Sequence, residues 1–188
     1  ITALAGYSYD ITTNDGNVGP GGILTFYGTT LGPGENFRVD GSAETNGMFR
    51  MYGGQGADTF IGGAGNDGFY FGRDGRFDVA TDHVDGGAGT NDQFALDGSY
   101  TVTISDTNVT NVEVLALLDG TAAIHAVYNI TLADDWTLAG QTHTVYAVQV
   151  RDGFTLDASA ESDGNLKVYG GLGSDTITTG AGNDWIHG

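Results

Sequence analysis

The chain has 188 residues, of which 33 are Gly, only 2 are Pro and none is Cys. Lys and Arg number 6 against 24 Asp and Glu, so the formal net charge is −18. The lack of cysteine excludes disulfides, thiol catalysis and cysteine–zinc sites, and the shortage of cations argues against a nucleic-acid partner. The length suits one or two domains. No apolar run is long enough for a membrane span, so no transmembrane segment is predicted.

Residues 1–52 are expected to form short strands joined by polar turns. Leu24–Tyr27, Phe37–Val39 and Met48–Tyr52 are rich in aromatic and apolar residues, and this composition favours strands. Gly32–Gly34 is typical of a turn. Gly41–Gly47 separates the second predicted strand from the third.

Two consecutive copies of one nonapeptide follow, at residues 53–61 and 62–70, each of the form Gly-Gly-x-Gly-x-Asp-x-apolar-x. The glycines permit a tight turn with uncovered carbonyls, and the Asp adds a carboxylate at a fixed place. The x-apolar-x tail predicts a short strand with one side chain pointing inward. Oxygen ligands on a flexible turn suit calcium better than magnesium. The spacing therefore predicts calcium-binding turns that alternate with strands.

This nonapeptide is typical of solenoid repeats that bind calcium. The chain resembles the RTX family of hemolysin-type calcium-binding proteins, which are secreted bacterial repeat proteins. The resemblance implies an all-β fold, a right-handed parallel β-solenoid in which each nonapeptide forms half a turn. It also implies several Ca²⁺ ions between turns two repeats apart. Type I secretion, to the medium or to the bacterial cell surface, is a further implication.

Two weaker copies of the motif come next. In Arg73–Val79 the turn glycines are partly lost, but Asp78 keeps the position of the ligand. Gly86–Phe94 has one extra residue before its acid, so Asn91 and Asp92 are alternatives for the same role. Both segments are expected to form turns that face the stronger copies.

Residues 98–153 lack glycine-rich turns. Tyr100–Ile104 alternates as a strand does, and three apolar runs rich in strand-forming residues follow at Val109–Leu118, Ala123–Ile130 and Thr144–Val150. The Leu and Ala content of Val112–Leu118 would also suit a helix, but its β-branched neighbours favour a strand. We expect metal-free rungs of the same stack, and the alternative is a separate small β domain.

A second, longer repeat links the two halves of the chain. Residues 37–70 match residues 154–187 without a gap and with about half of the positions identical, at an offset of roughly 117 residues. Tyr9–Thr12 also resembles Tyr128–Thr131. The predicted organisation is strands at 1–52, a calcium block at 53–97, metal-free rungs at 98–153 and a second calcium-binding copy at 154–188. Such self-similarity indicates a segment or building block of a longer repetitive protein.

The side-chain ligands predicted for calcium are Asp58, Asp67, Asp175 and Asp184. Glu44 and Glu161, beside Asn46 and Asp163, are either further ligands or residues of ordinary polar turns. The weaker copies would add Asp78, Gly86, Ala88 and Asp92. By resemblance, turn carbonyls complete the shells, from Gly53, Gln55, Gly62, Ala64, Gly170 and Leu172.

If ions lie between turns two repeats apart, the Gly53–Asp58 turn should share one with Arg73–Asp78. The Gly62–Asp67 turn should face either Gly86–Asp92 or Glu44–Gly47. No motif of a hydrolase or metalloprotease occurs, so we expect calcium-dependent folding rather than catalysis. The parent would be a surface-layer protein, an adhesin or a matrix component, with further copies of itself or other cell-surface components as partners. The alternative parent is a secreted enzyme whose catalytic domain lies outside this chain.

Overall fold

The computed structural model describes residues 1–73, 76–120 and 125–188. The chain forms two compact units, which are described separately. Unit 1 contains Ile1–Phe94 and Asn108–Val112, and unit 2 contains Ala95–Thr107 and Glu113–Gly188. The fold is all-β with parallel sheets, and its one helical segment in the described residues is a single 3₁₀ turn, η1 (Asp15–Asn17). The predicted parallel β-solenoid is thus confirmed.

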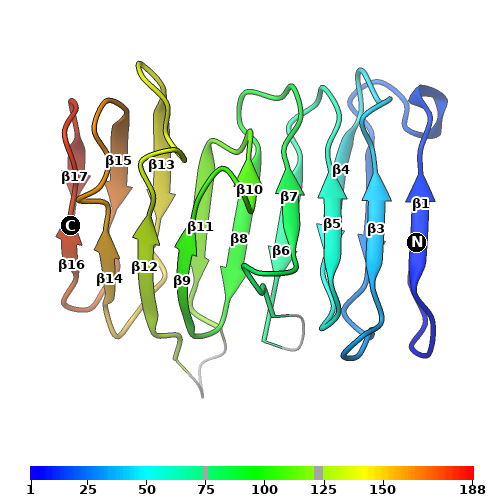
Figure 1. The fold of residues 1–188 in the computed structure, drawn as a ribbon, viewed down its shortest axis with the longest axis horizontal. Coiled ribbons are helices and arrows are strands. Elements are labelled where there is room, and N and C mark those ends of the chain that lie inside the picture. Colours follow the sequence, from blue (N-terminus) through cyan, green and yellow to red (C-terminus); the bar gives the residue numbers. More distant parts are fainter. Residues whose placement is uncertain (74–75, 121–124) are drawn as a thin grey trace. The chain divides into compact units, whose positions relative to one another are not determined.

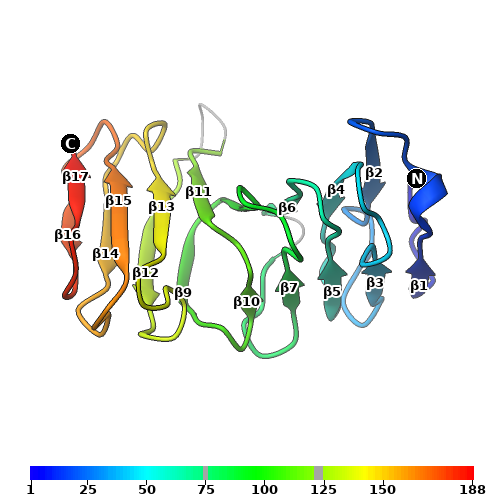
Figure 2. The ribbon, with the colours of Figure 1, turned by 90° about the horizontal axis from the view of Figure 1, so that it is seen from above.

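Two parallel sheets form unit 1 (Figures 1 and 2). One has the order β1-β3-β5-β7-β10, with β1 at Tyr9–Thr12, β3 at Phe37–Asp40, β5 at Asp58–Ile61, β7 at His83–Asp85 and β10 at Val109–Thr110. The other includes β2 (Ile23–Tyr27), β4 (Met48–Tyr52) and β6 (Gly68–Phe71). Strand β8 (Gln93–Asp97) begins in this unit beside β6, because the Gln93 amide donates to the Asp67 carbonyl at 2.8 Å. Consecutive strands therefore alternate between the sheets, as in a solenoid.

Inward-pointing phenylalanines fill the space between these sheets. The register places Phe37 beside Asp58 and Val39 beside Phe60, so equivalent side chains of successive rungs stack in columns. The rings of Phe37 and Phe60 lie 5.7 Å apart, edge to face. Phe60 and Phe69, the in-phase apolar residues of the two nonapeptides, are fully buried. Each such ring pair contributes on the order of 1 kcal/mol beyond its buried area.

Unit 2 has the same two-sheet plan. One sheet has the order β9-β12-β14-β16, with β9 at Tyr100–Ile104, β12 at Tyr128–Leu132, β14 at Phe154–Asp157 and β16 at Thr176–Thr178. The other contains, in order, β11 (Val114–Leu118), β13 (Thr142–Tyr146), β15 (Asn165–Tyr169) and β17 (Trp185–His187). All of these pairings are parallel. Strands of the glycine-poor middle therefore form rungs of the same stack as the second calcium-binding copy.

The middle of the chain departs in detail from the expected strands. Val109–Leu118 is divided into β10 and β11 at Asn111, whose φ of 51° no strand can accommodate. Residues 112–118 contain the predicted strand, β11, and no helix. Strand β13 ends at Tyr146 because the chain turns, with the Val150 amide donating to the Ala147 carbonyl at 2.8 Å. The first residues of the run Ala123–Ile130 lie outside the described part of the chain, and β12 begins at Tyr128.

Polar side chains tie the rungs of unit 2 together where glycine turns are missing. The buried Tyr128 hydroxyl lies within hydrogen-bonding distance of the carbonyls of Leu96 and Leu118 and can donate its proton to either. Arg151 lies 3.0 Å from Oδ2 of Asp119, a carboxylate that is only 7 % exposed. The Arg151 amide also donates to Oδ1 of Asp119 at 3.1 Å. In these rungs the protein supplies its own cation to a buried turn carboxylate.

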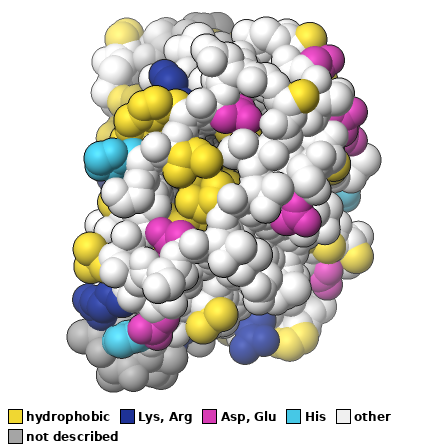
Figure 3. Space-filling view, turned by 90° about the vertical axis from the view of Figure 1, so that its left-hand side faces the viewer, with side chains coloured by type: hydrophobic (Ala, Val, Ile, Leu, Met, Phe, Trp, Pro, Cys, Tyr) yellow, Lys and Arg dark blue, Asp and Glu magenta, His cyan; other side chains and the backbone are white. Residues whose placement is uncertain are grey.

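The last rung of unit 2 is the least buried. Ile177 and Ile186, the in-phase apolar residues of the second pair of nonapeptides, are half-buried and 49 % exposed, respectively. Figure 3 shows apolar side chains in the middle of this end of the stack. Strand β17 is the last of its sheet and has a neighbour, β15, on one side only. The apolar residues of this rung therefore lie in the expected phase without a layer above them.

Candidate calcium-binding turns

Each nonapeptide Asp lies where a turn passes into a strand. Asp58 is the first residue of β5, and Asp67 immediately precedes β6. Side chains two apart in a strand share a face, so these carboxylates point inward with Phe60 and Phe69. Asp58 is fully buried and Asp67 is 2 % exposed. The spacing of the motif therefore places a charged group at the inner edge of each turn.

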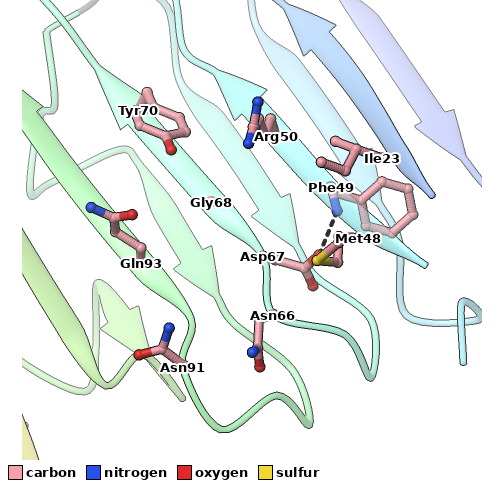
Figure 4. Close-up of a pocket in the computed structure, with 10 residues that line it drawn as sticks. All are labelled: Ile23, Met48, Phe49, Arg50, Asn66, Asp67, Gly68, Tyr70, Asn91 and Gln93. Carbon is pink, nitrogen blue, oxygen red and sulfur yellow. Dashed lines mark hydrogen bonds between the residues drawn. The ribbon is translucent and has the colours of Figure 1, made fainter. Parts of the chain in front are cut away.

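Both oxygens of these carboxylates accept backbone hydrogen bonds. Oδ2 of Asp67 accepts from the Gly63 amide at 2.7 Å, within its own turn. Oδ1 accepts from the Phe49 amide at 2.6 Å, in the preceding rung (Figure 4). Asp58 makes the same pair of bonds, to Gly54 at 2.7 Å and Phe37 at 3.1 Å. Each oxygen keeps a further lone pair, so a carboxylate can join two rungs and still coordinate a cation.

Close stacking of the turns explains their glycines. A Cβ on Gly62 would overlap Oδ2 of Asp67, and a Cβ on Gly65 would overlap the Gly47 carbonyl of the preceding turn. Gly87, in the next turn, has φ of 91° and would meet the Gly63 carbonyl in the same way. The glycines thus bring carbonyl and carboxylate oxygens of successive turns together. This donor chemistry fits a hard, oxygen-seeking cation.

The Gly62–Asp67 turn has neighbours on both sides. Its Ala64 amide donates to the Glu44 carbonyl at 2.9 Å, and the Ala88 amide of the following turn donates to its Gly63 carbonyl at 2.9 Å. Both turns that the sequence offered as partners are therefore adjacent to it. The Gly53–Asp58 turn is stacked in the same way on the turn before it at the other edge of the sheets. Its Gln55 amide donates to the Leu31 carbonyl at 3.1 Å.

Asp82, which lies outside the predicted ligand set, occupies the position expected for Asp78. Its oxygens accept from the amides of Asp78 and Asp58, both at 2.8 Å. These bonds repeat the pattern of Asp58 with Gly54 and Phe37, one rung earlier. Asp82 is fully buried, whereas Asp78 is exposed and accepts from the Ala80 amide. One feature of the sequence could have pointed to Asp82. It lies four residues after Asp78, whose amide it accepts from, just as Asp58 lies four residues after Gly54.

Between Asn91 and Asp92, the structure places the acid at the inner edge of the turn. Asp92 is fully buried, and its Oδ1 accepts from the Asp67 amide at 2.6 Å. Asn91 is exposed. The extra residue of this copy is thus absorbed in the turn, and the acid stays in phase with the strand.

Glu44 and Glu161 are buried, at 1 % and 3 % exposure. Oε1 of Glu44 accepts from the amides of Asn46 and Gly47, at 3.1 and 2.9 Å, and Glu161 caps its own turn in the same way. Asn46 and Asp163 contribute these amides, and both residues are exposed. Oε2 of Glu44 is buried and has no hydrogen-bond partner among the described residues. A buried carboxylate oxygen in this state beside the Asp67 turn is suited to a metal ion.

In the second pair of nonapeptides, Asp175 makes both hydrogen bonds and Asp184 makes the one to the preceding rung, and both acids have less cover. Asp175 accepts from the amides of Gly171 and Phe154, at 2.8 and 3.2 Å, and Asp184 accepts from Leu166 at 2.9 Å. Both carboxylates are half-buried. Leu172, whose carbonyl was a predicted ligand, has a 76 % exposed side chain. These turns therefore repeat the geometry of unit 1 in a more solvated setting.

Burial raises the pKa of three of the buried carboxylates, Asp58, Asp67 and Asp82. Desolvation is the largest cause, and it brings Asp58 to about 7 and Asp67 and Asp82 to about 6. The charge of Asp82 also raises the pKa of Asp58, and that of Glu44 raises the pKa of Asp67. The backbone hydrogen bonds act in the opposite direction. Without a cation, ionising these groups costs more free energy in the folded chain than in the unfolded chain.

These shifts predict an unusual pH dependence for unit 1 in chelator. Because folded Asp58, Asp67 and Asp82 hold protons more tightly than unfolded Asp, whose pKa is about 3.9, stability should fall as the pH rises from about 4 to about 7. Native-state hydrogen exchange, read on peptides from residues 48–71 and corrected for intrinsic rates, should show greater protection at pH 5 than at pH 7.5.

Saturating calcium should remove this preference, because metal binding requires the ionised carboxylates. Unit 2 provides an internal contrast. Burial lowers the pKa of His143 to about 4. Its contribution to the stability of unit 2 is therefore fully present above a pH of about 6.5, the pKa of unfolded His, and is lost as the pH falls towards about 4. Equal protection of unit 1 at both pH values in chelator would contradict the raised pKa values.

Across the residues that the structure describes, no group of three or more acidic or histidine side chains gathers at one point. A calcium site here would therefore take much of its shell from backbone carbonyls, as the predicted ligand set does. The described residues also include no helix of a length and apolarity sufficient for a membrane crossing.

Comparison with known proteins identifies the turns. The model of the RTX calcium-binding nonapeptide repeat matches four copies, over residues 50–75 and 167–188. These ranges contain the paired turns described above. RTX nonapeptide repeats bind calcium. No curated protein and no solved structure matched the chain.

Proposed function

We propose that calcium ions held between successive turns complete the fold of this RTX β-roll module. The observation that carries the proposal is a set of inward, buried carboxylates that form no ion pair with a Lys or Arg side chain of the described residues. The ion pairs of the described residues include none of Asp58, Asp67 and Asp82. Asp119, in a turn of the glycine-poor rungs, does have such a partner in Arg151. In the glycine-rich turns, calcium would neutralise the buried carboxylates as Arg151 neutralises Asp119.

Residues of three stacks would hold the ions. In one column of unit 1, the carboxylates of Asp58 and Asp82 act with carbonyls of Gly53 and Gln55, and Asp82 replaces Asp78 in this role. In the other column, Glu44, Asp67 and Asp92 act with carbonyls of the neighbouring turns, which are Gly62, Ala64, Gly86 and Ala88. In unit 2, the ligands are Glu161, Asp175 and Asp184 with carbonyls of Gly170 and Leu172. The ions supply positive charge and bonds that join rung to rung.

Calcium would then decide whether the chain folds. With a net charge of −18, self-repulsion opposes compaction, and each glycine-rich turn loses much backbone entropy on ordering. Binding to the folded state alone adds its free energy to stability. Extracellular calcium modules work at about 10⁻⁴–10⁻³ M. The chain would remain unfolded in the low-calcium cytosol and fold after secretion, at the cell surface or in the medium.

A calcium titration followed by far-UV circular dichroism tests this function. We expect a cooperative gain of β signal with a midpoint of about 10⁻⁴–10⁻³ M, and little response to magnesium, which demands a more rigid octahedral shell. Chelator should reverse the change. A chain that is already folded in chelator and unaffected by calcium would overturn the proposal.

The internal repeat favours a structural parent, in which many such units follow one another, over an enzyme with one terminal RTX block. In unit 1, β3 to β6 supply the rungs that β14 to β17 repeat in unit 2. Repeat arrays derive stability from each unit and its neighbours. Further copies of this unit in the flanking sequence would support a surface-layer, adhesin or matrix role. A flanking domain with catalytic motifs would support the secreted enzyme instead.

A further inference from the structure

The outward face of β2, β4 and β6 carries a cation in a shallow groove. Arg50 on β4 lies in register with Thr25 on β2 and Gly68 on β6. Because Gly68 has no side chain, a groove of about 160 Å³ remains beside Arg50. In Figure 4, Tyr70 lies at one end of the lining and the side chains of Asn66 and Asn91 lie at the other, and the buried Phe49 and Asp67 also line the groove. The amide side chains of the lining are those of Asn66, Asn91 and Gln93.

The second repeat has an equivalent groove. Lys167 on β15 lies in register with Thr144 on β13 and Trp185 on β17. Its groove, of about 440 Å³, is also lined by Asn165, Asn183 and Tyr169. Lys167 is the repeat counterpart of Arg50, and Asn183 that of Asn66. Two copies that differ at about half of their positions thus keep a cation and an amide in equivalent places of their grooves, while the lining tyrosines, Tyr70 and Tyr169, come from different positions of the repeat.

Packing explains the tyrosines of this face but not the cations. Tyr27, Tyr52 and Tyr70 stack along the sheet with ring centroids 5.0 and 4.7 Å apart, and Tyr146 stacks on Tyr169 at 4.6 Å. Such cross-strand aromatic pairs stabilise a sheet. Arg50 and Lys167, by contrast, are exposed and fill no core position.

The cations are also unusual for this chain, which has only 6 Lys and Arg residues. Arg38 pairs with Asp10 and Asp40, and Arg151 pairs with Asp119. The ion pairs of residues 1–73, 76–120 and 125–188 include neither Arg50 nor Lys167. In a protein with 24 acids, two equivalent cations that form no ion pair within the described residues are available to an anion from outside.

We propose that these grooves bind the carboxylate-bearing sugars of an acidic polysaccharide. A guanidinium or ammonium group forms strong, charge-assisted bonds with a carboxylate. Amides donate and accept, so they suit sugar hydroxyls, and tyrosine presents an apolar ring with a polar tip. An acidic protein partner fits less well, because stable protein interfaces need a sizeable apolar centre. The proposal needs the folded sheet, and Asp67, a proposed calcium ligand, also lines the first groove.

Isothermal titration calorimetry with a uronate hexamer tests the grooves. The full chain is first shown by circular dichroism to be folded in saturating calcium, and free calcium is buffered because uronates themselves bind it. Arg50→Gln and Lys167→Gln should each weaken the affinity of their own groove about tenfold or more, the effect of losing a charge-assisted contact. The double variant should show no specific binding. Arg50→Lys should retain most of the affinity.

Arg38→Gln is the matched control, since it removes the same charge from β3 and leaves both grooves intact. It should change the dissociation constant by less than about twofold. An equal loss in Arg38→Gln, equally tight binding of a neutral glucan hexamer, or no binding by the folded wild type would each overturn the proposal. If the wild type bound no uronate but self-associated, and Arg50→Gln abolished the self-association, the proposal would be wrong and the face would instead bind a second copy of the chain. Every variant is compared in its folded, calcium-loaded state, so failure here is distinct from failure of calcium-dependent folding.

Discussion

Asp67→Ala is expected to abolish calcium-dependent folding of unit 1 at physiological calcium. The substitution leaves the amides of Gly63 and Phe49 without their acceptor, and hydrogen bonds to a charged group contribute about 1.5–3 kcal/mol each. It also removes a carboxylate from the stack that contains Glu44 and Asp92. We expect a loss of about 3 kcal/mol or more in the free energy of unfolding and a rise of at least about tenfold in the calcium midpoint.

Two further variants separate the metal from the hydrogen bonds. Asp67→Asn keeps one oxygen acceptor and the volume of the side chain, so it should recover part of the stability in chelator but little of the calcium response. Asp106→Asn removes the same charge at an exposed position and should match the wild type within about 0.5 kcal/mol. Urea unfolding of all three at fixed free calcium measures these effects. A normal calcium midpoint in Asp67→Ala would exclude this carboxylate as a ligand.

Asp82→Ala should be far more damaging than Asp78→Ala, although only Asp78 stands at the expected place in the motif. Asp82 is fully buried and accepts from the amides of Asp58 and Asp78. Its loss should cost about 3 kcal/mol and raise the calcium midpoint. Asp78 is exposed, so its replacement should cost less than about 1 kcal/mol.

The same calcium titration and urea unfolding compare the two variants, which are matched in charge and lie four residues apart. Hydrogen exchange of peptides spanning β5 and β7 would show whether the damage is confined to the rungs that Asp82 joins. If Asp78→Ala shifted the calcium midpoint more than Asp82→Ala, the assignment of Asp82 to this column of turns would be wrong.

Much of the fold could be predicted because the nonapeptide is a local code. The turn glycines, the acid and the inward residue lie within nine positions of one another, and each is required by contacts inside the turn or with the next rung. Phe60 and Phe69 are accordingly buried, and the paired turns match the RTX calcium-binding repeat. The strand content of residues 98–153 was also predictable, because alternating and β-branched runs report a local preference.

By itself, the sequence determined that this protein is a parallel β-solenoid with RTX calcium-binding repeats. Only the tertiary structure decided which acid occupies an irregular turn. Asp82 replaces Asp78, and Asp92 rather than Asn91 points inward, because the acid must be in phase with the following strand. Which residue points inward depends on the register of each strand with the preceding rung, which lies some twenty residues away in the sequence. The length of the turn adjusts to that register. The grooves beside Arg50 and Lys167 likewise exist only because parallel register aligns side chains from three separate strands.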